Sequence, residues 1–137
     1  MIELNGPPTL AASGPVRVLI VDDDRRVRQS LSGLIALRDG LDVVGTAGDR
    51  QAALAVVRAN EPEAVLLDLR LPELEDGFGL LADLRRGWPK IRIVAMSVQV
   101  SLRDAALAAG AVGFVPKGGH PESIGDAIAE LGRAQDH

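Results

Sequence analysis

The sequence predicts a doubly wound α/β domain, because five strand-sized apolar runs alternate with segments of helical period and the central runs are apolar on both faces. Strict alternation of strand and helix indicates a parallel sheet. Strands that are apolar on both faces indicate that helices cover both sides of that sheet. The expected strands are residues 16–21, 41–47, 64–68, 91–96 and 112–115.

Each segment that follows one of these strands carries evidence for a helix. In the first segment, apolar residues recur at the spacing that places them on one helix face, namely Val27, Leu31, Leu34 and Ile35. The last segment repeats this pattern with Ile124, Ala127, Ile128 and Leu131. We expect Asp49 to cap the second helix, Gly110 to close the fourth and Pro121 to lie in the first turn of the fifth.

Length and composition indicate one folded domain. The 137 residues, of which 47% are hydrophobic, suffice for one sizeable core and leave no room for a second full domain. We expect a flexible N-terminal arm at residues 1–15, rich in Gly, Pro, Ser and Ala, a folded domain at 16–133 and a C-terminal tail at 134–137.

Charge, cysteine content and the N-terminal residues limit the partners and the cellular location expected for the domain. A net charge of −4 argues against direct binding of nucleic acid or anionic lipid by this segment. The absence of cysteine excludes disulfides and thiolate metal sites. No signal peptide or membrane span is visible, so we expect a cytoplasmic protein.

Polar residues terminate four of the five apolar runs. Asp22 and Asp23 follow the first run, Asp68 the third and Ser97 the fourth, and Lys117 comes just past the fifth. In a doubly wound sheet the ligand site lies beyond the carboxyl ends of the strands, where these side chains would meet. Three close carboxylates repel one another, and Mg²⁺ is the natural cation to keep them ionised. A carboxylate can also attack phosphorus, with positive charge from a metal ion and a lysine.

These motifs resemble the receiver domains of bacterial response regulators. The matching segments are VLIVDDD, VLLDLRLP, IVAMS and GFVPK, which stand in the order of that family at nearly its spacing. The resemblance covers about residues 16–131. It implies a flavodoxin-like (βα)5 three-layer sandwich with strand order 2-1-3-4-5.

The resemblance also implies a role for each matching residue. Asp68 is expected to be the phosphoacceptor, and a Mg²⁺ ion is expected to bind Asp22, Asp23, Asp68 and the backbone carbonyl of Arg70, with Asp23 the more direct ligand of the acid pair. Ser97 and Lys117 are expected to contact the phosphoryl group. Phe114 occupies the position of the switch aromatic, which would couple the site to the surface formed by the fourth helix, fifth strand and fifth helix.

Partners and output are likewise implied by the resemblance. A sensor histidine kinase would supply the phosphoryl group, and a homodimer would form through that switch surface or through the first and fifth helices. The only chemistry expected is self-phosphoryl transfer and autodephosphorylation, so the domain is not expected to be an enzyme. The segment GFVPKGGHPESIGDAIAEL is similar to receivers of LuxR-type transcription regulators, which suggests control of transcription through a domain outside this chain.

The sequence departs from the family pattern in two loops and at two single positions. The loop LPELEDG is one residue longer than usual, and the stretch SVQVSLRD is about two residues shorter. Val98 replaces a very small residue and could narrow access to Asp68. Gly118, rather than proline, follows Lys117.

Simpler interpretations exist for each residue of the cluster. Asp22, Asp23 and Asp24 suit the acidic entry of a helix, Ser97 suits a turn, Lys117 a solvated loop and Phe114 a core position. Two other functions are open: a receiver that binds partners without phosphorylation, and an aspartate-nucleophile phosphatase of the haloacid dehalogenase type. The second lacks its general acid, because the chain reads Asp68-Leu69-Arg70.

Overall fold

The computed structural model describes residues 14–117 and 121–134, which form five strands and their intervening helices. The strands are β1 (Val16–Val21), β2 (Leu41–Ala47), β3 (Ala64–Asp68), β4 (Arg92–Ser97) and β5 (Gly113–Pro116). The helices are α2 (Arg25–Ala36), α3 (Arg50–Asn60), α4 (Leu74–Gly87), α5 (Arg103–Ala108) and α6 (Pro121–Ala134), with a 3₁₀ turn η2 (Val100–Leu102) before α5.

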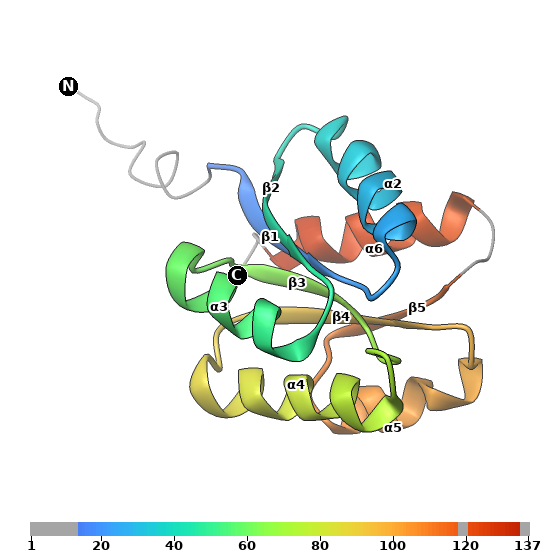
Figure 1. Cartoon of the computed structure of the whole chain (residues 1–137). Helices are drawn as coiled ribbons and strands as arrows, with labels where there is room; N and C mark the ends of the chain where they lie inside the picture. The colour runs from blue at the N-terminus through green and yellow to red at the C-terminus, as the bar shows by residue number, and fades with distance from the viewer. Residues whose placement is uncertain (1–13, 118–120, 135–137) are drawn as a thin grey trace.

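The five strands form one parallel sheet in the order β2-β1-β3-β4-β5. Helices α2 and α6 cover one face, and α3, α4 and α5 cover the other (Figure 1). The order reverses direction at β1, because β2 lies on one side of it and β3 to β5 on the other. This is the flavodoxin-like α/β fold that the sequence predicted.

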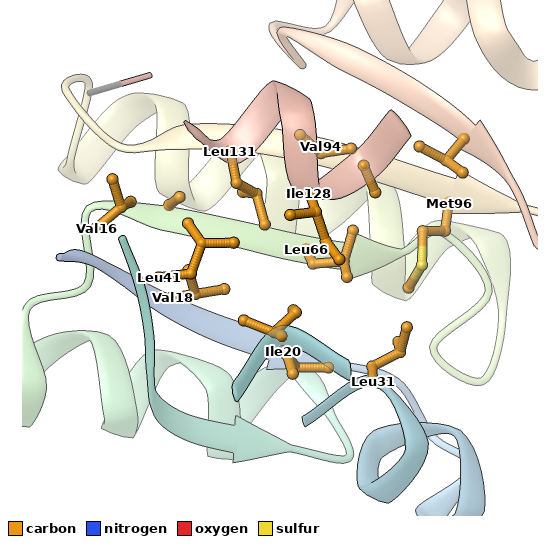
Figure 2. Close-up of a cluster of buried hydrophobic side chains, with 14 residues drawn as sticks. Val16, Val18, Ile20, Leu31, Leu41, Leu66, Val94, Met96, Ile128 and Leu131 are labelled. Atoms are coloured by element: carbon orange, nitrogen blue, oxygen red, sulfur yellow. The ribbon is translucent and has the colours of Figure 1, made fainter. Parts of the chain in front are cut away.

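Two large apolar clusters hold the helices to the two faces. On the face covered by α2 and α6, Leu31 and Ile35 pack with Ile128 and Leu131 against strand side chains such as Leu66 (Figure 2). On the opposite face, the cluster comprises Leu19, Val21, Ala47, Ala53, Val57, Val65, Leu67, Leu71, Leu80, Leu81, Leu84, Ile91 and Ile93. Since β3 is buried along its whole length, the residue that ends it is held in a rigid setting.

Three expectations about local structure need correction. Strands β4 and β5 each begin and end one residue later than predicted, so Ile91 and Val112 belong to the preceding turns. The N–H of Ile91 donates to the carbonyl oxygen of Trp88 at 3.0 Å, which closes the turn before β4. Leu34 is 44% exposed, because the buried stripe of α2 is narrower than the apolar spacing suggested. The side chain of Ile124 lies outside the described residues.

The predicted helix ends are confirmed. The side chain of Asp49 accepts a hydrogen bond from the N–H of Ala52 at 2.8 Å and caps α3. Gly110 follows α5 with a φ of +116°, a conformation that favours glycine. Helix α6 begins at Pro121. No helix in residues 14–117 and 121–134 is both long enough and apolar enough to span a bilayer.

Candidate functional site

Three carboxylates converge at the carboxyl edge of the sheet. Asp22 follows β1 directly and is fully buried, Asp23 is exposed beside it, and Asp68 ends β3 and is 2% exposed. One carboxylate oxygen from each of the three lies within 4.8 Å of the others. Because β1 and β3 are adjacent and parallel, their carboxyl ends bring together residues that lie far apart in the chain.

Lys117 supplies positive charge to this cluster. Its Nζ donates to Oδ2 of Asp68 at 2.7 Å and lies 2.9 Å from Oδ2 of Asp22. The backbone N–H of Lys117 donates to the carbonyl oxygen of Ser97 at 2.9 Å, which fixes the chain just past β5 against the end of β4. The structure therefore joins Asp22, Asp68 and Lys117 in one ion-pair network.

The surroundings change the proton affinity of two of these groups. Burial raises the pKa of the Asp68 carboxyl, and the negative charge of Asp22 raises it further, whereas the hydrogen bonds from Lys117 and from the N–H of Arg70 lower it without cancelling the rise. Burial on its own would lower the pKa of the Lys117 ammonium, but its contacts with Asp68 and Asp22 outweigh burial and raise that pKa. The two carboxylates thus keep the lysine charged, while burial makes the Asp68 carboxyl costly to ionise.

The donor set fits a hard divalent cation. Oδ2 of Asp22 is buried and accepts no hydrogen bond of good geometry, although the ammonium of Lys117 lies nearby. A buried carboxylate oxygen without a hydrogen bond destabilises the fold through its lost hydration, and a divalent cation that binds oxygen ligands would offset this free-energy cost. Of the residues expected to bind metal, Asp22, Asp23 and Asp68 are brought together here.

The adjacent acid Asp24 has a different role. The backbone N–H of Asp24 donates to Oδ1 of Asp22 at 2.8 Å, and the side chain of Asp24 accepts from the N–H of Arg26 at 2.8 Å. Asp24 is the N-cap of α2. The simpler interpretation as a helix entry therefore applies to Asp24 but not to the buried carboxylate of Asp22.

Ser97 and Phe114 lie on the other side of Asp68. Ser97 is 3% exposed and follows Met96, which is the register partner of Asp68 on β4. The Oγ of Ser97 accepts a hydrogen bond from the N–H of Gln99 at 3.0 Å. Phe114 is half-buried and packs against a small cluster between the sheet and α5, made of Leu69, Ala95, Ala106 and Ala111.

Val98 and Gly118 depart from the family pattern at single positions. Val98 is 66% exposed, so most of its side chain faces solvent rather than filling the space around Asp68. Gly118 lies outside the described residues, as do His120 and His137.

Two residues that shape the site were not identified from the sequence. Gln99 accepts a hydrogen bond from Arg70 at 2.7 Å through Oε1, which links the loops that follow β3 and β4. Gly77 lies in α4 against the loop after Asp68, where a Cβ atom would come 1.8 Å from the carbonyl oxygen of Leu69. A glycine inside a helical segment is a signal of such close approach, whereas nothing in the sequence marks Gln99.

Known proteins are similar to this chain in sequence. The family model described as "Response regulator receiver domain" matches residues 18–129. A protein-glutamate methylesterase/protein-glutamine glutaminase of Anaeromyxobacter dehalogenans is 37% identical over 116 residues, covering 82% of this chain and 31% of that protein. The DNA-binding transcriptional activator DevR/DosR of Mycobacterium tuberculosis is 37% identical over 120 residues, covering 85% of this chain and 54% of the activator.

Solved structures agree with the sequence comparisons. A two-component response regulator of the LuxR family from Aurantimonas superposes with a TM-score of 0.77 at 32% identity, covering 85% of each chain. The expected likeness to LuxR-type receivers is thereby confirmed. The chain spans about a third to a half of the length of the curated relatives named above. On the match over residues 18–129 and the acidic edge of its sheet, the chain belongs to the response regulator receiver domain family.

Proposed function

We propose that this domain accepts a phosphoryl group on Asp68 from a sensor histidine kinase and passes the change to an output domain outside this chain. The observation that carries the proposal is the buried network of Asp22, Asp68 and Lys117, with Asp23 beside it, at the carboxyl edge of a receiver fold. If Asp68 were only a polar residue at the end of a strand, a second buried carboxylate and an ammonium group shared between the two would not be expected beside it.

Each residue has a distinct task in the proposed transfer. One carboxylate oxygen of Asp68 attacks the phosphorus of a phosphohistidine, the P–N bond breaks, and its electron pair leaves with the imidazole nitrogen. Lys117, already 2.7 Å from Asp68, holds positive charge beside the oxygens of the transferred group. The Oγ of Ser97 accepts a hydrogen bond from the N–H of Gln99, and the hydroxyl is proposed to donate its proton to a phosphoryl oxygen.

The proposal includes Mg²⁺ as the cofactor. Asp22, Asp23, Asp68 and the backbone carbonyl of Arg70 would hold the ion. When bound, Mg²⁺ supplies charge neutralisation among the carboxylates and for the incoming phosphoryl oxygens.

Signal output is proposed to run through α5, β5 and α6. Phe114 on β5 packs against the cluster that contains Ala106 of α5, and its ring is proposed to move when Ser97 shifts toward a phosphoryl group. This surface, or α2 together with α6, is the proposed homodimer contact. Regulation of transcription is the proposed output, in line with DevR/DosR, whereas the methylesterase relative favours an enzymatic output domain.

The remaining parts of the proposal concern the setting of the domain. We propose a cytoplasmic protein in which residues 16–133 form the receiver domain, preceded by the arm at 1–15 and followed by the tail at 134–137. No nucleic acid or membrane is proposed to bind this segment directly. The domain is proposed not to turn over external substrates, beyond phosphorylating and dephosphorylating itself.

A receiver that acts without phosphorylation is the second candidate function. Val98 and the two altered loops favour this candidate, but Val98 is mostly exposed and Lys117 pairs with both Asp22 and Asp68. A phosphatase is disfavoured because Arg70 stands where that class has its general acid.

Intact mass measurement tests the proposal. The parent domain, incubated with acetyl phosphate and Mg²⁺, is expected to gain the mass of one phosphoryl group. Asp68→Asn is expected to gain none, while the exposed control Asp39→Asn gains it as the parent does. An unmodified parent would leave the phosphorylation-independent candidate, and turnover of a small phosphate ester would favour the phosphatase.

A further inference from the structure

A side-chain hydrogen bond joins two loops across the phosphoacceptor. The Nη2 of Arg70 donates to Oε1 of Gln99 at 2.7 Å, a contact called here the Arg70–Gln99 bridge. The backbone N–H of Arg70 also donates to Oδ1 of Asp68 at 3.1 Å, and the backbone N–H of Gln99 donates to Oγ of Ser97 at 3.0 Å. The bridge therefore connects the loop beside the phosphoacceptor to the loop beside the hydroxyl.

The partner of the Arg70 guanidinium in this bridge is neutral. A guanidinium and a phosphoryl group carry opposite charges and often form bidentate hydrogen bonds, whereas the amide oxygen of Gln99 accepts one hydrogen bond and carries no charge. Arg70 is exposed, so its side chain is free to change partner without leaving a packed core. A phosphoryl group on Asp68 would lie next to the residue whose backbone already contacts that carboxylate.

The side chains of the loop that the bridge restrains are poorly buried. Val98 is 66% exposed and Val100 is 57% exposed, and none of residues 98–102 is buried. This loop leads through η2 directly into α5, which is only six residues long. A segment with so few buried contacts opens at low free-energy cost once a restraining contact is lost.

We propose that Arg70 releases Gln99 and binds the phosphoryl oxygens when Asp68 is phosphorylated, so that the Arg70–Gln99 bridge restrains the loop before α5 only in the unmodified protein. This inference rests on the proposed role of Asp68. It adds no covalent step, because the bond between Asp68 and phosphorus stays intact and only hydrogen-bond partners change. Arg70 thereby acts through its side chain, in addition to the carbonyl offered to the metal ion.

Two alanine variants distinguish a bridge whose arginine later binds the phosphoryl group from a bridge that only holds the two loops together. The probe is beryllium trifluoride with Mg²⁺, a stable mimic of the phosphoryl group. Binding is measured by calorimetry, and loop opening is measured by hydrogen exchange of the amides of residues 98–102. Both Arg70→Ala and Gln99→Ala remove the bridge, so both are expected to speed exchange in the absence of the probe.

The two variants are expected to differ in binding the probe. Arg70→Ala loses a charged contact and is expected to bind roughly tenfold more weakly, whereas Gln99→Ala frees the guanidinium and is expected to bind at least as tightly as the parent. Arg70→Lys is expected to recover part of the affinity. In the parent, the probe is expected to raise loop exchange to the level of free Gln99→Ala. The exposed control Arg38→Ala is expected to match the parent in both measurements.

The outcomes distinguish this inference from the proposed function. If Arg70→Ala binds the probe as tightly as the parent does, or if both alanine variants lose affinity equally, Arg70 does not move from Gln99 to the phosphoryl oxygens. The role of Asp68 as phosphoacceptor would still stand. If the probe binds the parent but leaves loop exchange unchanged, the release of the loop is wrong. If the parent does not bind the probe, the proposed function and this inference fail together.

Discussion

Lys117 and Asp68 form the central ion pair of the site, with Nζ 2.7 Å from Oδ2, although they are 49 residues apart in the chain. The same ammonium lies 2.9 Å from the buried Asp22. One cation therefore serves two buried carboxylates, which leaves the cluster short of positive charge.

Replacement of the lysine should make the fold depend on magnesium. Lys117→Ala removes the ammonium and leaves Asp22 and Asp68 buried without a counter-charge, which we expect to lower the free energy of unfolding by about 3 kcal/mol in EDTA. Mg²⁺ should restore most of this loss, because the variant keeps all three carboxylates. Thermal unfolding with and without Mg²⁺ measures both effects.

Charge at that position can be separated from packing. Lys117→Arg keeps a cation and should lose less stability in EDTA than Lys117→Ala does. Equal melting temperatures for parent and Lys117→Ala in EDTA would show that the ion pair contributes nothing net. The alanine variant, even with Mg²⁺ bound, should also lose partner binding or dimerisation that depends on phosphorylation, and full retention would contradict the role given to the lysine.

The raised pKa of the Asp68 carboxyl predicts a pH-dependent cost. Below its ordinary value of 3.8 the carboxyl is protonated in both the folded and unfolded chains. As the pH rises through the folded-state value, the folded chain must ionise a group that the unfolded chain has already ionised. The contribution of Asp68 to the free energy of unfolding therefore falls between pH 3.8 and the raised folded-state pKa, and it stays low at higher pH.

Asp68→Asn tests that sign. Without Mg²⁺ the variant should be at least as stable as the parent at neutral pH, and its advantage should shrink as the pH falls toward 3.8. Chemical unfolding over a pH series measures the difference. Mg²⁺ should stabilise the parent more than the variant, by mass action. A variant that is much less stable than the parent at neutral pH without Mg²⁺ would contradict the raised pKa.

The cluster was predictable from the sequence because of a geometric rule. Parallel strands place their carboxyl ends at one edge, so Asp22 and Asp68 had to meet once both were recognised as strand-end residues. Buried apolar runs fixed the strands themselves. The first residues of β4 and β5 were predicted one position too early, because Ile91 and Val112 have strand-like side chains but precede the strands. Backbone hydrogen bonding, not hydrophobicity, decides where a strand begins.

Other parts of the site were beyond prediction from the sequence. The Arg70–Gln99 bridge depends on the path of two loops, which no periodicity specifies. Leu34 is 44% exposed although its spacing matches that of the buried Leu31 and Ile35, because apolar spacing within one helix does not specify how far neighbouring elements cover it. Contacts between irregular segments are thus the information that the structure adds.

Phe114 should matter for stability whether or not it acts in signalling. Its ring is half-buried among Leu69, Ala95, Ala106 and Ala111. Phe114→Ala is expected to cost about 2 kcal/mol, less than a fully buried phenylalanine would. Phosphorylation of Asp68 by acetyl phosphate should persist, because the ring belongs to none of the groups proposed to contact the phosphoryl group. Loss of phosphorylation in a variant that still folds would contradict this separation, and Phe114→Leu serves as the conservative control.

Replacement of Gly77 by a larger residue should lower both stability and the rate of phosphorylation, because no space exists for a side chain there. A Cβ atom there would lie 1.8 Å from the carbonyl oxygen of Leu69, so Gly77→Ala must push α4 away from the loop that follows Asp68 and carries Arg70. We expect a loss of about 2 kcal/mol or more in stability, with slower phosphorylation by acetyl phosphate. Gly87→Ala, in the same helix, has nothing within 4 Å of its Cβ and should be neutral or stabilising by up to about 1 kcal/mol. Similar unfolding midpoints for the two variants would show that the contact with Leu69 does not constrain the loop.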